Sequence, residues 1–274
     1  MMDTINNLEK LKNTLYSIAP NRRIVLAFSG GVDSTILLYV MKHFDFDVLA
    51  VTFFTGLTDD RDSIYKAEAI AKEFNAQHIV KEFDALSIPG IMDNSKERCF
   101  ICKSRMFEEL SRIASENGYD VVCDGTNADD LGEFRPGLRA KEKYKVKSPI
   151  AMSGIRKSEI RDIGRSFSLD IANAPSSPCL LTRFPYGTMV SKEMIASVEK
   201  GEKILHSYGF LSCRLRHYGD VARIEVPVDR IDELLRIEEE ISQSIKALGF
   251  REVQIDMDGL RSGSMDRRFL NGNK

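Results

Sequence analysis

A short run of small and polar residues, Ser29-Gly30-Gly31-Val32-Asp33-Ser34, follows an apolar stretch at residues 22–28 and precedes another at residues 35–41. This order predicts a buried strand, a tight turn and a helix. A glycine pair lets the backbone turn sharply and come close to a ligand, and the first N–H groups of a helix favour anions. Serine hydroxyls can donate hydrogen bonds, and the Asp33 carboxylate can hold Mg²⁺ against phosphate oxygens. The sequence therefore predicts a polyphosphate site here rather than an ordinary glycine turn.

A second polar loop, Gly125-Thr126-Asn127-Ala128-Asp129-Asp130, comes at the end of another predicted strand. Glycine, small polar side chains and paired acids at a strand end suit metal-bound phosphate or ribose. The alternative is a solvent-exposed turn, which uses the same residue types. Beside the first loop, we predict nucleotide contacts from Gly125, Thr126 and Asp129. Arg135, a little farther along the chain, can brace a phosphate or a carboxylate.

Four of the five cysteines differ in their surroundings along the chain. Cys99 and Cys102 have a spacing that lets two thiolates meet one metal centre, so they are half of a zinc site, a redox pair or two idle thiols. Cys123 lies inside an apolar strand, where a core thiol is expected. Cys213 begins a strand, and we assign it no role.

The remaining cysteine, Cys179, lies in a loop at residues 177–183 beside a proline, a threonine and Arg183. The guanidinium of Arg183 can lower the pKa of the Cys179 thiol. Together, the thiolates of Cys99, Cys102 and Cys179 would hold three irons of a cubane cluster and leave one iron open.

A basic pair, Arg214 and Arg216, has period-two spacing, so both guanidiniums would face one side of a strand. Arg223 lies on the predicted partner strand. Two arginines on a rigid hairpin make a good phosphate clamp, and a solvated basic face is the alternative. Glu199 and Glu202 share one face of the preceding helix, where they can simply be solvated.

The composition limits the class of protein. The chain has 274 residues, of which 43% are hydrophobic and 29% charged, and its formal net charge is −2. These values fit a soluble globular protein and disfavour a strongly basic nucleic-acid-binding protein. No apolar run approaches the roughly 18–20 residues that a membrane helix needs, and no secretory signal is evident. Cysteines without such a signal favour thiols, metal ligands or catalysis over disulfides. We expect a cytoplasmic location.

The elements that position these residues alternate in the first part of the chain. Helices are predicted at residues 3–18, 35–41, 59–75, 103–117 and 157–168, and strands at 22–28, 47–54, 76–83, 120–125 and 145–150. Such alternation predicts an α/β domain, residues 1–172, in which helices cover both faces of a parallel sheet. Ligands of such sheets bind at the carboxyl ends of the strands, where the two polar loops lie.

A smaller α+β domain is predicted at residues 173–274. It begins with a linker or loop at residues 174–178 and ends with a polar tail from Gly259. Its elements are helices at 191–208 and 229–248, a hairpin of 213–217 with 221–226, and a last strand at 250–257. The domain would carry the sulfur-bearing loop at its start and the arginine pair on its hairpin.

The first loop lacks the lysine of a Walker A motif and resembles the PP-loop of the ATP pyrophosphatases. Taken with the other motifs, the chain resembles the LarE family of ATP-dependent sulfur transferases over nearly its whole length. The motifs that carry the resemblance are Ser29 to Ser34, Gly125 to Asp130, Arg135-Pro136-Gly137, Cys179 to Gly187 and Arg214-Leu215-Arg216.

The resemblance implies a fold and a reaction. The fold is the adenine-nucleotide alpha-hydrolase-like (HUP) parallel sheet. Family members use ATP and Mg²⁺ to adenylate a carboxylate of a pyridinium dicarboxylate mononucleotide, a small-molecule substrate, and convert it to a thiocarboxylate for a nickel-pincer cofactor. Cys179 matches the cysteine that delivers sulfur, either by giving up its own or, with Cys99 and Cys102, through a 4Fe-4S cluster. Arg214 and Arg216 match the pair expected to hold the substrate phosphate.

Within this resemblance, the ATP-binding residues are Ser29, Gly30, Gly31, Asp33, Ser34, Gly125, Thr126 and Asp129, and Asp33 also holds Mg²⁺. The family further implies a homo-oligomer, and the sequence does not name the source of sulfide.

Three other functions stay open. A tRNA-thiolating enzyme uses the same phosphate loop, but the acidic balance and the lack of a basic, aromatic-rich extension disfavour RNA. An amide-forming ATP pyrophosphatase similar to NAD synthetase would need none of the three cysteines. A nucleotide-binding sensor would not release pyrophosphate.

Overall fold

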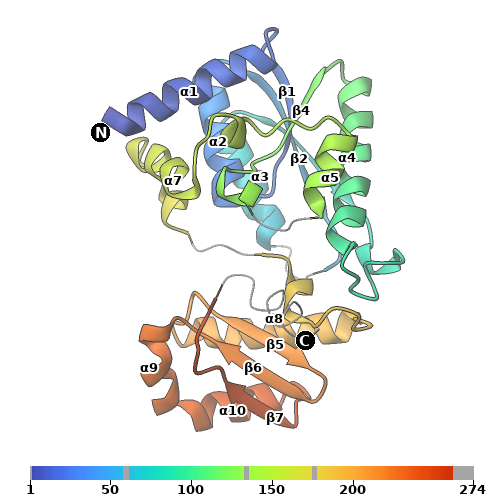
Figure 1. Cartoon of the computed structure of the whole chain (residues 1–274), viewed down its shortest axis with the longest axis vertical. Helices are drawn as coiled ribbons and strands as arrows, with labels where there is room; N and C mark the ends of the chain where they lie inside the picture. The colour runs from blue at the N-terminus through green and yellow to red at the C-terminus, as the bar shows by residue number, and fades with distance from the viewer. Residues whose placement is uncertain (1, 58–61, 133–135, 175–177, 262–274) are drawn as a thin grey trace. The chain divides into compact units, whose positions relative to one another are not determined.

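The computed structural model describes residues 2–57, 62–132, 136–174 and 178–261 (Figure 1). The chain forms two compact units. Unit 1 comprises residues 1–55, 60–83 and 97–176, and unit 2 comprises residues 56–59, 84–96 and 177–274. Each unit is described by itself. The predicted boundary at residue 172 stays a prediction, and most of the predicted linker and tail, with Arg135, lies outside the described residues.

Unit 1 is built on a parallel sheet, as the sequence predicts. Its described strands are β1 (Arg23–Ala27), β2 (Asp47–Phe54), β3 (Gln77–Glu82) and β4 (Val121–Cys123), in the order β3-β2-β1-β4. Every neighbouring pair is parallel; for example, Ile24 is opposite Val48 on one side and Val121 on the other. The carboxyl ends of β1 and β4 therefore lie side by side, and this brings the two predicted nucleotide loops to one edge of the sheet.

Helices cover both faces of this sheet (Figure 1). They are α1 (Met2–Ile18), α2 (Val32–His43), α3 (Asp62–Glu73), α4 (Arg98–Glu116), α5 (Gly137–Lys143), α6 (Pro149–Met152) and α7 (Lys157–Ser166). Helices α1, α2 and α7 pack together on one face, and α4 packs with α5 on the other. The α/β class is confirmed.

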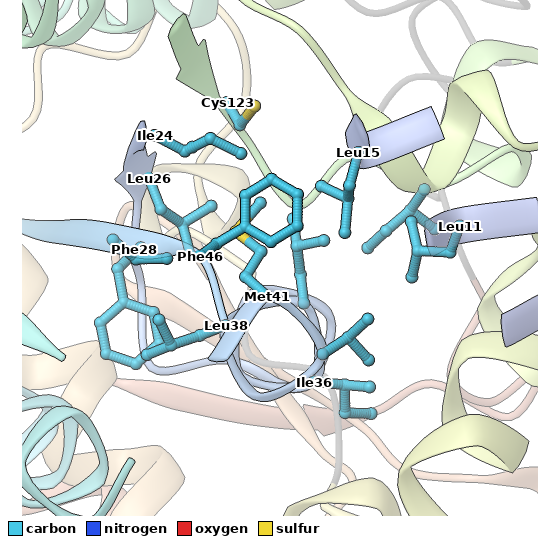
Figure 2. Close-up of a cluster of buried hydrophobic side chains, with 14 of the residues drawn as sticks. Leu11, Leu15, Ile24, Leu26, Phe28, Ile36, Leu38, Met41, Phe46 and Cys123 are labelled. Carbon is cyan, nitrogen blue, oxygen red and sulfur yellow. The ribbon is translucent and has the colours of Figure 1, made fainter. Parts of the chain in front are cut away.

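The core of unit 1 follows the alternation of side chains along its strands. Ile24 and Leu26 of β1 belong to a buried cluster with residues of α1 and α2, drawn in Figure 2. Val25, between them, belongs to a second cluster with Phe107 and Leu110 of α4. Because β1 is buried on both faces, its sequence is a continuous apolar run rather than an alternating one.

Two predicted elements of unit 1 differ from the structure. Helix α4 begins at Arg98, five residues earlier than residue 103, and so contains Cys99 and Cys102. The fifth strand predicted at 145–150 is wrong: the structure gives an isolated bridge between Cys123 and Lys147, and α6 follows. Pro149 has no N–H for a sheet and suits the first turn of a helix.

Unit 2 contains a second sheet. Strands β5 (Arg214–Tyr218) and β6 (Val221–Glu225) form the predicted antiparallel hairpin, and β7 (Glu252–Ile255) pairs parallel to β6. Helix α8 (Lys192–Ser207) packs on β5, and α10 (Glu238–Lys246) contacts β7 and α8. The helix predicted at 229–248 is wrong as one element: α9 (Ile231–Arg236) ends before Ile237, and α10 begins after it.

Short 3₁₀ turns complete the described chain, namely η1 (Ala85–Ser87), η2 (Asp129–Gly132), η3 (Asp170–Asn173), η4 (Leu180–Arg183) and η5 (Val228–Arg230). In the ranges described, every helix is too short or too polar to cross a membrane.

Candidate functional site

The first polar loop turns between β1 and α2 and leaves the start of that helix open. Gly30 has a φ of +67°, which glycine adopts without strain. The Ser29 and Ser34 hydroxyls lie 3.1 Å apart, and the Gly31 N–H donates to Ser29 Oγ over 3.3 Å. Gly31 is the N-cap of α2, and no described side chain caps the helix. The first N–H groups of α2 are therefore available to an anion.

Only one carboxylate oxygen of Asp33, in the first turn of α2, has a hydrogen-bond partner among the described residues. Its Oδ2 accepts a hydrogen bond from Asn127 Nδ2 over 3.1 Å, and its buried Oδ1 has no partner among the described residues. Burial raises the pKa of the Asp33 carboxyl, and the Asn127 amide opposes this shift. A buried carboxylate oxygen without a donor is the kind of ligand that Mg²⁺ takes, so the residues present fit a bound magnesium ion.

The second polar loop lies directly against the first. A Cβ on Gly125 would lie 2.9 Å from the backbone nitrogen of Ser34, so glycine is needed for this close approach. Asn127, 1% exposed, reaches Asp33 from this loop and was not among the predicted site residues. The only indication in the sequence was that Asn127 lies between Thr126 and Asp129. Asparagine is common in turns, so this position alone does not identify it as a site residue.

Two residues predicted to bind nucleotide have protein partners here. The Thr126 hydroxyl donates to Asp124 Oδ2 over 2.7 Å. The Asp129 Oδ2 accepts from the Lys157 backbone N–H over 2.9 Å, at the first residue of α7. A carboxylate at that place stabilises the start of the helix. Their nucleotide contacts stay predictions.

A buried polar chain lies next to Thr126 and was missed from the sequence. Lys141 Nζ donates to Ser148 Oγ over 2.6 Å, and Ser148 Oγ donates to Asp124 Oδ1 over 2.5 Å. All are nearly buried, and burial lowers the pKa of Lys141. Lys141 and Ser148 also line a surface hollow of about 520 Å³. Buried charges need such pairing, and the network fixes the chain at the carboxyl end of β4.

Cys99 and Cys102 lie in the first turn of α4, in unit 1. They are three positions apart, so their side chains share one face of the helix. Cys99 is exposed and Cys102 half-buried, with its sulfur 4.0 Å from Met106 Sδ. Just before them, Glu97 forms an ion pair with Arg139 of α5. The pair of thiols is thus presented on a helix start that α5 helps to hold.

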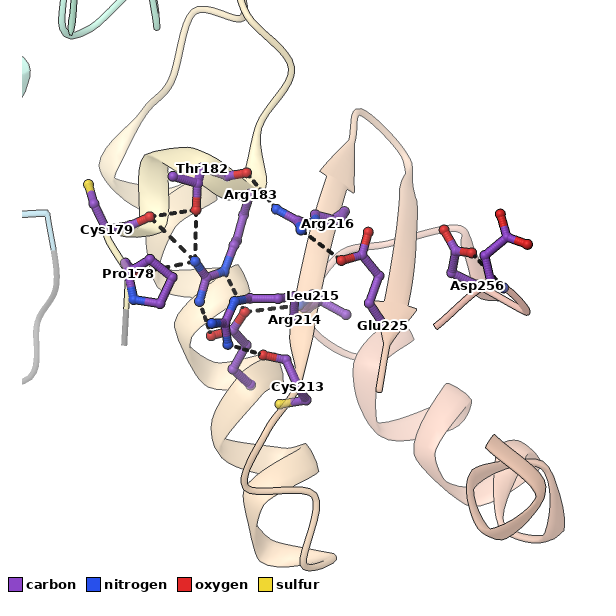
Figure 3. A network of polar contacts seen from close by, with 12 residues as sticks. Pro178, Cys179, Thr182, Arg183, Cys213, Arg214, Leu215, Arg216, Glu225 and Asp256 are labelled. Atoms are coloured by element: carbon purple, nitrogen blue, oxygen red, sulfur yellow. Dashed lines mark hydrogen bonds and ion pairs between the residues drawn. The ribbon is translucent and has the colours of Figure 1, made fainter. Parts of the chain in front are cut away.

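In unit 2, the loop that carries Cys179 is fixed through its backbone, whereas its thiol is exposed (Figure 3). The Cys179 carbonyl accepts hydrogen bonds from the Thr182 hydroxyl over 2.8 Å, from the Thr182 N–H over 3.1 Å and from Arg183 Nη1 over 3.4 Å. In Figure 3 the sulfur points away from this network. The exposed thiol thus belongs to a residue whose carbonyl is held by three hydrogen bonds.

Arg183 is the centre of this network and is 1% exposed. It forms two parallel hydrogen bonds with Glu202 of α8, of 2.7 and 2.9 Å. Glu202 Oε1 also accepts the Leu215 N–H over 2.9 Å. The alternative prediction, that the Glu202 side chain is simply solvated, is wrong, because this side chain is buried and forms an ion pair with Arg183. Helical spacing could place Glu202 on a face but not identify its partner nineteen residues away.

Arg214 and Arg216 follow on β5. Arg216 donates to the Thr182 carbonyl and to Glu225 Oε2, both over 2.7 Å. Arg214 is half-buried and donates to the Cys213 carbonyl over 2.5 Å. Burial lowers the pKa of Arg214, and the neighbouring charges of Arg183 and Arg216 act in the same direction. The sequence thus placed both arginines correctly on one strand, and the structure adds their partners.

Two cysteines are core residues. Cys123 and Cys213 are fully buried, and burial raises the pKa of both thiols, that of Cys213 to about 12 with a contribution from Glu202. Raised pKa values make thiols poor nucleophiles. Within the described ranges, no group of three or more His, Cys, Asp or Glu side chains is placed to hold a metal ion.

Comparisons with known proteins add the following. A family model described as a family of unknown function, DUF7411, matches residues 22–176. An uncharacterised protein of Methanocaldococcus jannaschii is 35% identical over 94% of this chain and 98% of its own. The pyridinium-3,5-bisthiocarboxylic acid mononucleotide synthase of Lactiplantibacillus plantarum is 34% identical over 89% of both chains. A tRNA-specific 2-thiouridylase of Rickettsia rickettsii is 26% identical over 70% of this chain and 63% of its own.

Proposed function

Because this chain belongs to the LarE-type family of pyridinium-3,5-bisthiocarboxylic acid mononucleotide synthases, we propose that it converts a carboxylate of a pyridinium dicarboxylate mononucleotide to a thiocarboxylate. Its class is that of the ATP-dependent sulfurtransferases. The observation that carries the proposal is the similarity to the Lactiplantibacillus enzyme across both units. The open phosphate loop of unit 1 and the exposed thiol of unit 2 support it.

The first half of the proposed reaction activates the acid. A carboxylate is a poor electrophile because its leaving group would be oxide, and AMP is a far better one. The carboxylate oxygen attacks the α-phosphorus of ATP, and the bond to pyrophosphate breaks. The N–H groups at the start of α2 and the hydroxyls of Ser29 and Ser34 would hold the departing pyrophosphate. Mg²⁺ bound by Asp33 would supply charge neutralisation there.

The second half delivers sulfur. The Cys179 thiolate attacks the acyl carbonyl, AMP leaves, and a thioester forms. Loss of the Cα proton and breakage of the Cβ–S bond then release the thiocarboxylate and leave dehydroalanine in the chain. In the alternative version, a 4Fe-4S cluster held by Cys99, Cys102 and Cys179 would supply a transferable sulfide instead. The thiols of Cys99 and Cys102 fit two of its ligand positions by sharing a helix face.

Arg214 and Arg216 are proposed to hold the substrate phosphate. What supports Arg214 is its environment: burial, and after it the neighbouring cations Arg183 and Arg216, disfavour its charged form, and a phosphate placed there would oppose both effects. Arg216 gives the strand a second positive charge on the same side. We further propose a homo-oligomeric, cytoplasmic enzyme, with its sulfide source left open.

Intact-mass analysis before and after turnover tests the proposal. Loss of one hydrogen sulfide, placed at Cys179 by peptide mapping, is expected for the version that sacrifices the cysteine. An unchanged mass after many turnovers, with iron and sulfide in anaerobically purified protein, is expected for the cluster version. Cys179→Ala should abolish thiocarboxylate formation in both, whereas Cys123→Ala, which removes a core thiol, should retain it. Full activity of Cys179→Ala would contradict the proposal.

A tRNA-thiolating function is the second candidate, because the Rickettsia thiouridylase is also a relative. In that reaction the adenylated group would be a base carbonyl. Filter binding with bulk tRNA separates the two candidates: we expect no retention of tRNA. Saturable binding of tRNA, with no pyrophosphate released on the pyridinium mononucleotide, would favour the thiouridylase function.

A further inference from the structure

A buried asparagine joins two distant parts of unit 2. Asn94 is fully buried and has a φ of +48°, a left-handed conformation that asparagine tolerates better than most residues. Its side-chain Nδ2 donates to the Phe184 carbonyl over 3.0 Å and to the Pro185 carbonyl over 2.9 Å. Its own carbonyl accepts the Gly187 N–H over 3.2 Å. One residue therefore binds three positions of the 184–187 segment.

These bonds fall at the downstream end of the loop that carries Cys179. Phe184 directly follows the 3₁₀ turn η4, its ring is buried, and it lies 5.1 Å from the His217 ring. Pro185 has no N–H, so this segment cannot be held by an ordinary strand ladder. The two N–H groups of the Asn94 side-chain amide instead donate to the carbonyls of this segment. Asn94 is thus the contact that fixes where η4 ends.

The upstream end of the same turn is held separately. The Cys179 carbonyl is bound by Thr182 and Arg183, and Arg183 is bound by Glu202. With the far end held by Asn94, the turn η4 is constrained at both of its ends, and Cys179 lies directly before it. Reaction rates depend steeply on such placement, because a misplacement of about 1 Å can cost roughly 100-fold.

We infer that Asn94 is a positioning residue for sulfur transfer: it sets the place of the Cys179 thiol by holding the carbonyls of Phe184 and Pro185. The inference rests on the proposed function, since it deepens the role of Cys179 in it. Asn94 itself touches no reacting atom. Its effect should fall on the sulfur-transfer half of the reaction, whereas the phosphate loop of unit 1 should be unaffected.

The variant Asn94→Gly removes the amide but keeps the left-handed backbone and the bond from Gly187. Asn75→Gly is the matched control, since Asn75 is also left-handed, with a φ of +52°, but exposed. Asn94→Asp is a second variant, which keeps the shape and loses one or both donors. Circular dichroism and thermal unfolding show whether each variant is folded before it is assayed.

Two quantities are then measured for each variant that is folded. The first is the amount of thiocarboxylate formed per pyrophosphate released, with ATP and the pyridinium dicarboxylate mononucleotide. The second is the rate of Cys179 alkylation by iodoacetamide, relative to Cys99, from peptide mass spectrometry. We expect the ratio to fall roughly 10- to 100-fold in Asn94→Gly, with pyrophosphate release within about 2-fold of the original protein. The relative alkylation rate should change severalfold, and Asn75→Gly should change neither.

A purely structural asparagine would give a different pattern. Equal losses of pyrophosphate release and thiocarboxylate, or an unchanged ratio and alkylation rate in a folded variant, would overturn the inference. If the original protein makes no thiocarboxylate, the proposed function fails. The alkylation rate then still decides whether Asn94 controls the Cys179 thiol, so the two failures are distinguishable.

Discussion

The phosphate loop of unit 1 and the arginine cluster of unit 2 differ in how far their polar groups are paired within the protein. The loop leaves the α2 helix start uncapped by any described side chain, and Asp33 Oδ1 is buried without a described partner. The cluster, made of Arg183, Glu202, Arg216 and Glu225, pairs its charges internally at 2.7 to 2.9 Å. Both are built of strongly polar residues, yet one is open and the other is closed.

This difference suggests different roles: a ligand-binding role for the phosphate loop and a structural role for the paired charges. Buried polar groups are almost always hydrogen-bonded in folded proteins, so an exception needs an explanation. For Asp33 we propose that the explanation is a bound magnesium ion. A buried ion pair contributes little net stability, but removal of one partner is costly. The pairing of Arg183 with Glu202 in this cluster therefore acts as a rigid frame for the Cys179 loop, whereas Arg216 is also proposed to contact the substrate phosphate. Each prediction below tests one side of this comparison.

The largest effect is expected from Glu202→Gln, because it leaves the Arg183 guanidinium buried and uncompensated. The free energy of unfolding should fall by about 3–5 kcal/mol, measured by urea denaturation. Glu193→Gln, an exposed acid on the same helix, is the control and should change it by less than about 0.5 kcal/mol. A loss for Glu202→Gln as small as the control's would show that the cluster is not a frame.

Asp33→Asn should chiefly affect the rate of pyrophosphate release. The amide keeps the size of the side chain but removes the charge that would bind Mg²⁺, so we expect a loss of about 10²–10³-fold. Asp45→Asn makes the same change at an exposed residue and should leave the rate unaltered. Near-normal release by Asp33→Asn, at saturating Mg²⁺, would mean that the open oxygen has no ligand.

Gly125→Ala should weaken ATP binding with little loss of fold. The added Cβ would lie 2.9 Å from the Ser34 nitrogen, so the two loops must separate, and we expect the KM for ATP to rise about 10-fold, or about 1.4 kcal/mol. Gly164→Ala is the contrast, because its Cβ would meet the Ile36 side chain instead. It should lower the melting temperature and leave the KM unchanged. An unchanged KM in Gly125→Ala would argue against contact between loop and nucleotide.

A further effect, seen only above pH 9, concerns Cys213, which is buried near Glu202 of the closed cluster. Burial holds the Cys213 thiol neutral, with its pKa raised to about 12, whereas in the unfolded chain it ionises near pH 9. The native state then keeps a proton that the unfolded state loses, so stability falls as pH rises from 9 to 12, by about 1.4 kcal/mol per pH unit. Cys213→Ala should lack this part of the slope. Parallel pH profiles of the two proteins would show that the thiol ionises freely in the fold.

Local order along the chain was enough to predict the elements that flank the phosphate loop. Residues 22–41 contain a strand, a glycine turn and a helix in direct succession, and each follows from its own residues. The place of both loops at the carboxyl ends of parallel strands also followed, whereas the close approach of Gly125 to Ser34 comes from the structure. Asn127 was missed, since nothing local shows that a turn asparagine reaches an aspartate in another loop.

The start of α4 and the closed cluster were harder to predict for physical reasons. The N-cap of α4 is Glu97, whose side chain makes no cap hydrogen bond, so the usual signal for a helix start is missing. The break at Ile237 likewise has no proline or glycine to mark it. The pairing of Arg183 with Glu202 depends on how α8 packs against β5, and no spacing rule gives that.

The bonds between Asn94 and the 184–187 segment have a consequence for the order in which the chain is made. The donor is synthesised ninety residues before its acceptors, and residues 84–96 belong to unit 2 although unit 1 sequence lies on both sides. A ribosome-bound chain that stops after residue 176 therefore carries the stretch 84–96 before the rest of its unit has been made. Neither unit can be expressed as one uninterrupted fragment, and the C-terminal portion alone would lack the amide that holds its cysteine loop.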